Sequence, residues 1–143
     1  MTGARIQPVA GLDPLHTVPR PELRKAGGEL VVELFDASER RVELAFRPVQ
    51  AVRIWTLDLW IPPAAEGDAG RRVFEVAGSG WRRELAGQLE ELHPTASFLD
   101  NARHFVVPAG DDVVEVLAWQ LLWRRDGDHG AHPAEAPPSS IPG

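Results

Sequence analysis

The sequence predicts one α+β domain, built on a curved, mostly antiparallel sheet of about six strands with one main helix packed on one face. The chain has 143 residues, of which 43% are hydrophobic, which is enough for one buried core but not comfortably for two. Segments typical of strands recur along the chain, whereas only one segment has helical spacing. The resulting order, ββββ-α-ββ, leaves one helix to cover a wide sheet. The sheet must therefore curve or close in part into a barrel.

Residues 1–28 are expected to form an irregular arm, because four prolines and four glycines interrupt them. The apolar residues of this arm recur at every third position: Ile6, Val9, Leu12, Leu15 and Val18. Since the prolines disfavour a helix, we expect an extended arm that either docks these side chains on the domain or stays mobile.

Four strands are expected before the helix. Residues 29–36 are apolar and β-branched, and residues 41–47 alternate between apolar and polar, so the two segments predict a hairpin. Residues 50–61 form the next strand, but their apolar positions change parity midway. This change predicts a bulge near Ile54 and Trp55, or else a strand buried on both faces. A loop at 62–70 leads to a short strand at 72–77.

Residues 81–92 are the one segment with clear helical periodicity. Trp81, Leu85, Leu89 and Leu92 are spaced four, four and three apart, which places them on one helical face. Ser79 is in the position of an N-cap, and Pro94 ends the helix because its ring excludes helical continuation.

The segment from Arg103 to Trp123 predicts two more strands, 103–107 and 113–123, joined by a Pro-Ala-Gly-Asp-Asp turn. From residue 125 the chain is rich in proline, glycine and alanine and has few bulky apolar residues. We therefore expect an ordered domain over 29–124 and a disordered tail over 125–143.

Composition narrows the classes of function. The net charge of −6 argues against nucleic-acid binding, which needs a positive field, and favours a basic partner. The absence of cysteine excludes disulfides, thiolate nucleophiles and cysteine-based metal centres. No apolar run approaches the ~20 residues that cross a bilayer, and no signal peptide is evident. We expect a soluble cytoplasmic protein with no membrane partner.

The densest group of ionisable residues near apolar segments consists of His93, Asp100, His104, Asp111, Asp112 and Glu115. A histidine beside a carboxylate can act as a general base or bind a metal, but the spacing matches no metal motif. The Asp111–Asp112 pair also fits ordinary turn chemistry. Gly78-Ser79-Gly80 at the helix start could hold an anion, although it matches no phosphate loop or nucleophile elbow.

With no coherent catalytic motif and five tryptophans, the sequence favours a non-enzymatic protein-binding domain without cofactor or metal. Adaptors, inhibitors and immunity-type proteins of bacteria share this composition, which is an analogy only. The expected binding residues are Trp60 and Trp123 as exposed anchors, with Asp111, Asp112 and Glu115.

Two alternatives remain open at this level. The first is a small enzyme or ligand-binding domain with a pocket lined by His104 and Asp111 or Asp112. The second is self-association into a homo-oligomer through an edge strand.

Overall fold

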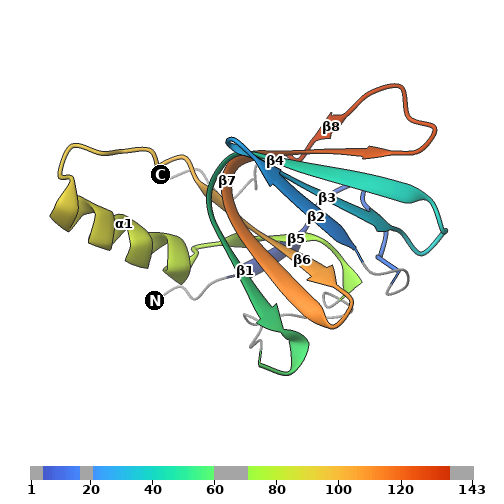
Figure 1. The fold of residues 1–143 in the computed structure, drawn as a ribbon, viewed down its shortest axis with the longest axis horizontal. Helices are drawn as coiled ribbons and strands as arrows, with labels where there is room; N and C mark the ends of the chain where they lie inside the picture. Colours follow the sequence, from blue (N-terminus) through green and yellow to red (C-terminus); the bar gives the residue numbers. More distant parts are fainter. Residues whose placement is uncertain (1–4, 17–20, 60–70, 136–143) are drawn as a thin grey trace.

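A computed structural model describes residues 5–16, 21–59 and 71–135 (Figure 1). Trp60, Val18 and the expected loop at 62–70 lie outside these ranges. The elements in chain order are β1 Arg5–Pro8, β2 Glu22–Ala26, β3 Glu29–Phe35, β4 Arg41–Thr56, a 3-10 turn Leu57–Leu59, β5 Phe74–Ala77, α1 Gly80–Leu92, β6 Arg103–Ala109, β7 Asp112–Arg125 and β8 His132–Pro133.

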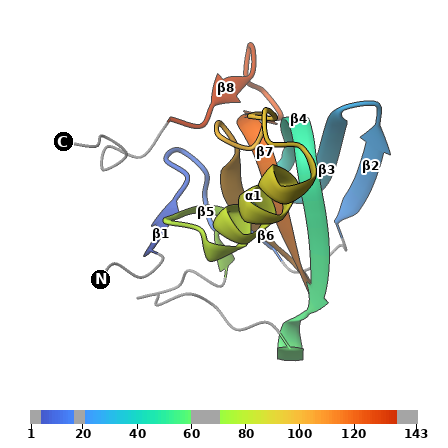
Figure 2. The same cartoon turned by 90° about the vertical axis from the view of Figure 1, so that its left-hand side faces the viewer.

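The strands form one antiparallel sheet in the order β1-β5-β6-β7-β4-β3-β2, with β8 paired to β7. The α+β class and the single main helix are therefore as predicted. The sheet has eight described strands rather than about six, because β1, β2 and β8 were not expected and two of the expected strands are one. Figures 1 and 2 show that the sheet is strongly curved, with β1 and β2 at its two edges.

The two strands predicted at 41–47 and 50–61 are one continuous strand, β4. The predicted bulge near Ile54 and Trp55 is misplaced, because the register against β7 shifts between Val49 and Ala51. The change of the apolar positions from even to odd numbers requires one extra residue in the strand, but it does not fix the position of that residue. The structure places the shift beside Pro48, which has no N–H to give to the ladder.

The main core lies on the inner face of the curved sheet. Its fully buried side chains come from β3, β4, β6 and β7, and Phe46 and Phe105 meet there with ring centroids 5.5 Å apart. Three side chains of the N-terminal arm, Val9, Leu12 and Leu15, are buried in the same cluster. Residues 9–15 of the arm are thus part of the hydrophobic core, whereas its strand Glu22–Ala26 is exposed.

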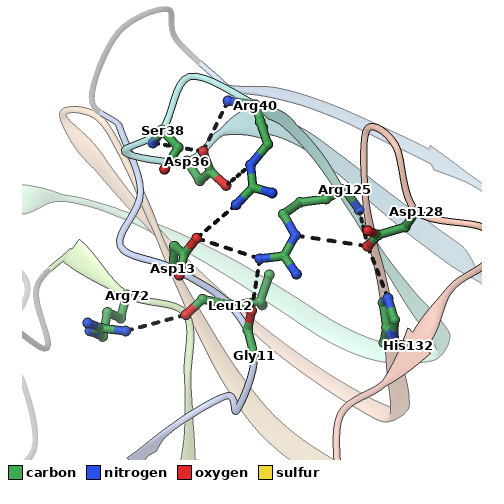
Figure 3. Close-up of polar contacts among 10 residues, drawn as sticks. All are labelled: Gly11, Leu12, Asp13, Asp36, Ser38, Arg40, Arg72, Arg125, Asp128 and His132. Carbon is green, nitrogen blue, oxygen red and sulfur yellow. Dashed lines mark hydrogen bonds and ion pairs between the residues drawn. The ribbon is translucent and has the colours of Figure 1, made fainter.

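Ion pairs hold the arm against the far end of the sheet (Figure 3). The Asp13 carboxylate lies 3.1 Å from the Arg40 guanidinium and 3.5 Å from that of Arg125. Arg125 also donates a hydrogen bond to the carbonyl of Gly11 at 3.2 Å. Charged side chains from the β3–β4 turn and from β7 therefore fix the path of a segment that has little secondary structure.

The tail predicted to be disordered from residue 125 is structured as far as residue 135. The Ala134 N–H donates to the Leu121 carbonyl at 2.9 Å, and the Ala134 side chain is buried. Arg103 donates to the carbonyls of Ala134 and Glu135 at 3.1 and 2.9 Å. A polar sequence is ordered here because a neighbouring arginine supplies the hydrogen bonds.

Helix α1 projects from the sheet and covers only part of its outer face (Figures 1 and 2). None of its side chains is buried, although Trp81, Leu85 and Leu89 pack partly against Leu117 of β7. Within the described residues, no helix has the length and apolarity to cross a membrane.

We expect Phe105→Ala to lower the free energy of unfolding by about 3–5 kcal/mol, because it opens a cavity in the centre of the core. Leu59→Ala, at an exposed position, should change it by less than about 0.5 kcal/mol. Urea denaturation of both variants measures the difference. Equal losses would show that the core is not where the structure places it.

Candidate functional site

Three buried polar side chains form a chain of hydrogen bonds across the outer face of the sheet. Ser79 Oγ lies 2.8 Å from His104 Nδ1, and His104 Nε2 lies 2.6 Å from Glu115 Oε1. The three residues are 4%, 6% and 3% exposed, respectively. A polar group buried this deeply costs desolvation free energy unless it is hydrogen-bonded. The hydrogen bonds among the three side chains are therefore what makes their burial possible.

Sheet register explains why these residues meet. His104 pairs with Leu117 and Val106 pairs with Glu115, so His104 and Glu115 are diagonal neighbours on one face of the β6–β7 hairpin. Arg53 of β4 lies directly opposite Glu115 on the other side. Ser79 reaches the same face because Gly78, with a φ of 70°, turns the chain sharply between β5 and α1.

Glu115 accepts four hydrogen bonds. Arg53 donates from Nε at 2.9 Å and from Nη2 at 3.2 Å, and the Trp55 indole N–H and His104 supply the other two. Burial alone would raise the pKa of Glu115. The hydrogen bonds from His104 and Arg53, with the positive charge of Arg53, outweigh burial and lower the pKa to about 2. Glu115 is therefore ionised and cannot serve as a proton donor near neutral pH.

The donors and acceptors assign the proton positions along the chain. His104 Nε2 must donate, because ionised Glu115 only accepts. In neutral His104, Nδ1 is then an acceptor for the Ser79 hydroxyl proton. The Ser79 oxygen in turn accepts from the Arg82 N–H at 3.1 Å, which makes it the N-cap of α1 as predicted.

A hydroxyl, an imidazole and a carboxylate in this order can act as nucleophile, general base and orienting group. Access is the difficulty, because Ser79 is buried and its oxygen already caps the helix. Two surface hollows of about 170 and 440 Å³ lie elsewhere, both bordered by Glu29 and Arg47. The described geometry thus provides the relay without showing a place for a substrate beside it.

Arg53 connects this buried network to the helix. Its guanidinium carbon lies 4.1 Å from the ring centroid of Trp81 and 5.4 Å from that of Trp55. The Trp81 ring meets His104 edge-on, with centroids 5.2 Å apart. One arginine therefore neutralises Glu115 and stacks on the first turn of α1 at the same time.

The acidic partners predicted for His104 are elsewhere. Asp111 is exposed and Asp112 half-buried in the β6–β7 turn, and neither forms a hydrogen bond or ion pair with His104. Five residues of strand separate His104 from this turn, about 17 Å at strand spacing. His93 and Asp100 are also exposed, beyond the end of α1.

The predicted exposure of Trp123 is wrong. Trp123 is 4% exposed and lies in the main core, because its register partner is Leu44 on the inner face. The other predicted anchor, Trp60, lies outside the described residues. Arg53 and Trp55 were not identified from sequence, although an arginine within the apolar segment 50–61 indicates a buried carboxylate partner.

A second feature is an exposed aromatic surface formed by Phe98 and Trp119, called here the Phe98–Trp119 surface. The Trp119 indole N–H donates to the Phe98 carbonyl at 2.8 Å, yet the two residues remain 40% and 47% exposed. Asp100 is exposed, and α1 has no basic residue in its last turn.

Comparisons with protein-family models, curated proteins and solved structures found no match to this chain. Across residues 5–16, 21–59 and 71–135, no group of three or more metal-ligating side chains could hold a metal ion. The site must therefore be interpreted from its own geometry.

The low pKa of Glu115 predicts acid sensitivity. Because the pKa is about 2 in the folded state and near 4.5 when unfolded, the network stabilises the protein fully above pH 4.5. About 3 kcal/mol of this stabilisation should be lost as the pH falls from 4.5 to 2. Denaturation across this range measures the loss, and NMR titration of the Glu115 carboxyl carbon measures the pKa directly. A Glu115 pKa near 4.5 would contradict the assignment of the four donors.

Proposed function

We propose that this protein is a non-enzymatic protein-binding domain and that its partner docks on the Phe98–Trp119 surface. The observation that carries the proposal is the aromatic pair itself. The hydrogen bond from Trp119 to the Phe98 carbonyl fixes both residues in position while leaving much of each side chain exposed. A rigid exposed tryptophan loses little entropy on binding and is the residue type most enriched at binding hot spots.

Charge favours a basic partner. The chain carries a net charge of −6, and the exposed Asp100 follows Phe98 by two residues in the chain. Complementary charge raises the rate of association and makes it sensitive to salt.

In this proposal the buried network has a structural task. Helix α1 has no buried side chain of its own, so its direction is set by the Ser79 cap, by the Arg53–Trp81 stack and by the partial packing of its leucines on Leu117. A fully hydrogen-bonded network resists rearrangement and so presents the far end of the helix in one orientation. Asp111, exposed in its turn, remains a proposed secondary contact, and the cytoplasm remains the proposed location.

The test is site-specific photo-crosslinking in the source cells, with a benzophenone side chain at position 98 or at Ile54. Ile54 is a matched control because it is exposed and apolar but lies on β4. We expect one basic protein crosslinked from position 98 and not from position 54. That protein is then purified for calorimetry.

In calorimetry, Phe98→Ala and Trp119→Ala should each weaken binding about tenfold or more, whereas Ile54→Ala should leave it unchanged. Binding should also weaken as salt rises. Crosslinking that is equal at both positions, or affinity that is indifferent to Phe98 and Trp119, would remove this surface from the proposal.

A second candidate function, a serine hydrolase, is favoured by the Ser79–His104–Glu115 chain alone. Ser79 Oγ would attack a carbonyl or phosphoryl centre and His104 Nδ1 would take its proton, while Glu115 holds the imidazole. The reaction needs no cofactor.

A fluorophosphonate probe separates the two functions. If Ser79 is an active nucleophile, its oxygen forms a bond to phosphorus, fluoride leaves, and the chain gains the mass of the probe adduct. Labelling should then disappear in Ser79→Ala and persist in Ser97→Ala, which changes an exposed serine. An unlabelled wild-type chain, shown by circular dichroism to be folded, would rule out the hydrolase.

A further inference from the structure

Strand β2 ends the sheet with an open edge. Its five residues, Glu22 to Ala26, are all exposed, and β3 is its one partner among the described residues. Figure 2 shows β2 on the rim of the molecule, away from α1. An open edge offers unpaired N–H and C=O groups to another strand.

The register of β2 against β3 tells which way each side chain faces. Leu23 pairs with Val32, which is fully buried in the inner core, so Leu23 lies on the inner face. Glu22 and Arg24 lie on the outer face, where Arg24 forms an ion pair with Glu33 at 2.8 Å. Glu22 is exposed, and none of the ion pairs among the described residues includes it.

Symmetry restricts how two copies of this edge can pair. A two-fold axis perpendicular to the sheet keeps inner residues opposite inner residues, so the axis must pass through a residue and not between two residues. An axis through Arg24 places two arginines face to face. An axis through Leu23 places Leu23 opposite its copy and Glu22 opposite Arg24 on both sides, which satisfies charge and hydrophobic contact together.

We propose that two copies of this chain associate through β2 in antiparallel pairing, with the two-fold axis at Leu23. The dimer joins two sheets into one. The exposed leucines meet at the centre and two Glu22–Arg24 pairs flank them. Because the paired strands are short, the dimer is weak and reversible. This proposal rests on β2 alone and stands apart from partner binding at the Phe98–Trp119 surface.

Sedimentation equilibrium of the full chain tests the register through charge reversal. The average molecular mass of the wild-type protein should rise with concentration, from the 15.7 kDa of one chain toward twice that value. Glu22→Arg places arginines opposite each other and Arg24→Glu places glutamates opposite each other, so each variant alone should dimerise about tenfold or more weakly.

An equimolar mixture of Glu22→Arg and Arg24→Glu chains should recover the dimer, because two arginines of one chain then face two glutamates of the other. Misfolding cannot produce this rescue. Glu84→Arg, on exposed α1, is the control and should match wild type. A wild-type chain that stays monomeric, single variants that dimerise normally, or a mixture that fails to recover would each overturn the proposal.

Discussion

The position of Glu115 constrains the arrangement of the strands around it. A carboxylate buried on a sheet face is stable only if donors surround it, and here the donors come from β4 and β6. Arg53 must lie opposite Glu115 to reach it with two nitrogens, so the β4–β7 register cannot slip without breaking the pair. The other ring nitrogen of His104 is hydrogen-bonded to the Ser79 hydroxyl, and Ser79 is the N-cap of the helix. A single ionised group thus links sheet register to helix placement.

Much of the fold follows from local sequence patterns. Residues 41–47 alternate cleanly, and residues 81–92 have a helical stripe, and both are regular in the structure. Strand β2 was missed because its residues are polar and follow a proline-rich stretch. The sequence does carry a hairpin signal at this place, because Gly27-Gly28 forms the two-residue turn between β2 and β3. The apolar face of residues 81–92 predicted a helix packed into the core. Periodicity shows which residues share a face, but it does not show how much of that face another element buries.

The candidate site could be predicted only in part. His104 and Glu115 were singled out as members of one group and Ser79 as a member of another. Asp111 and Asp112 were the expected partners of His104 because they are near it in sequence. Strand geometry decides otherwise, since residues two apart on paired strands share a face and the turn lies at the far end of the hairpin. Long-range register, which selects Arg53 as the partner of Glu115, has no local signature.

Helix α1 is fastened at its first turn and bears no buried side chain. Stability therefore places few demands on the exposed residues of its outer half, whereas Leu89 and the buried Leu99 and Ala102 pack with Leu117 of β7. Substitutions at those exposed residues can accumulate over generations without unfolding the domain, while Ser79, His104, Arg53 and Glu115 must be kept together. The molecule thus combines a tightly coupled frame with exposed positions that tolerate substitution, so its surface chemistry is separable from its fold.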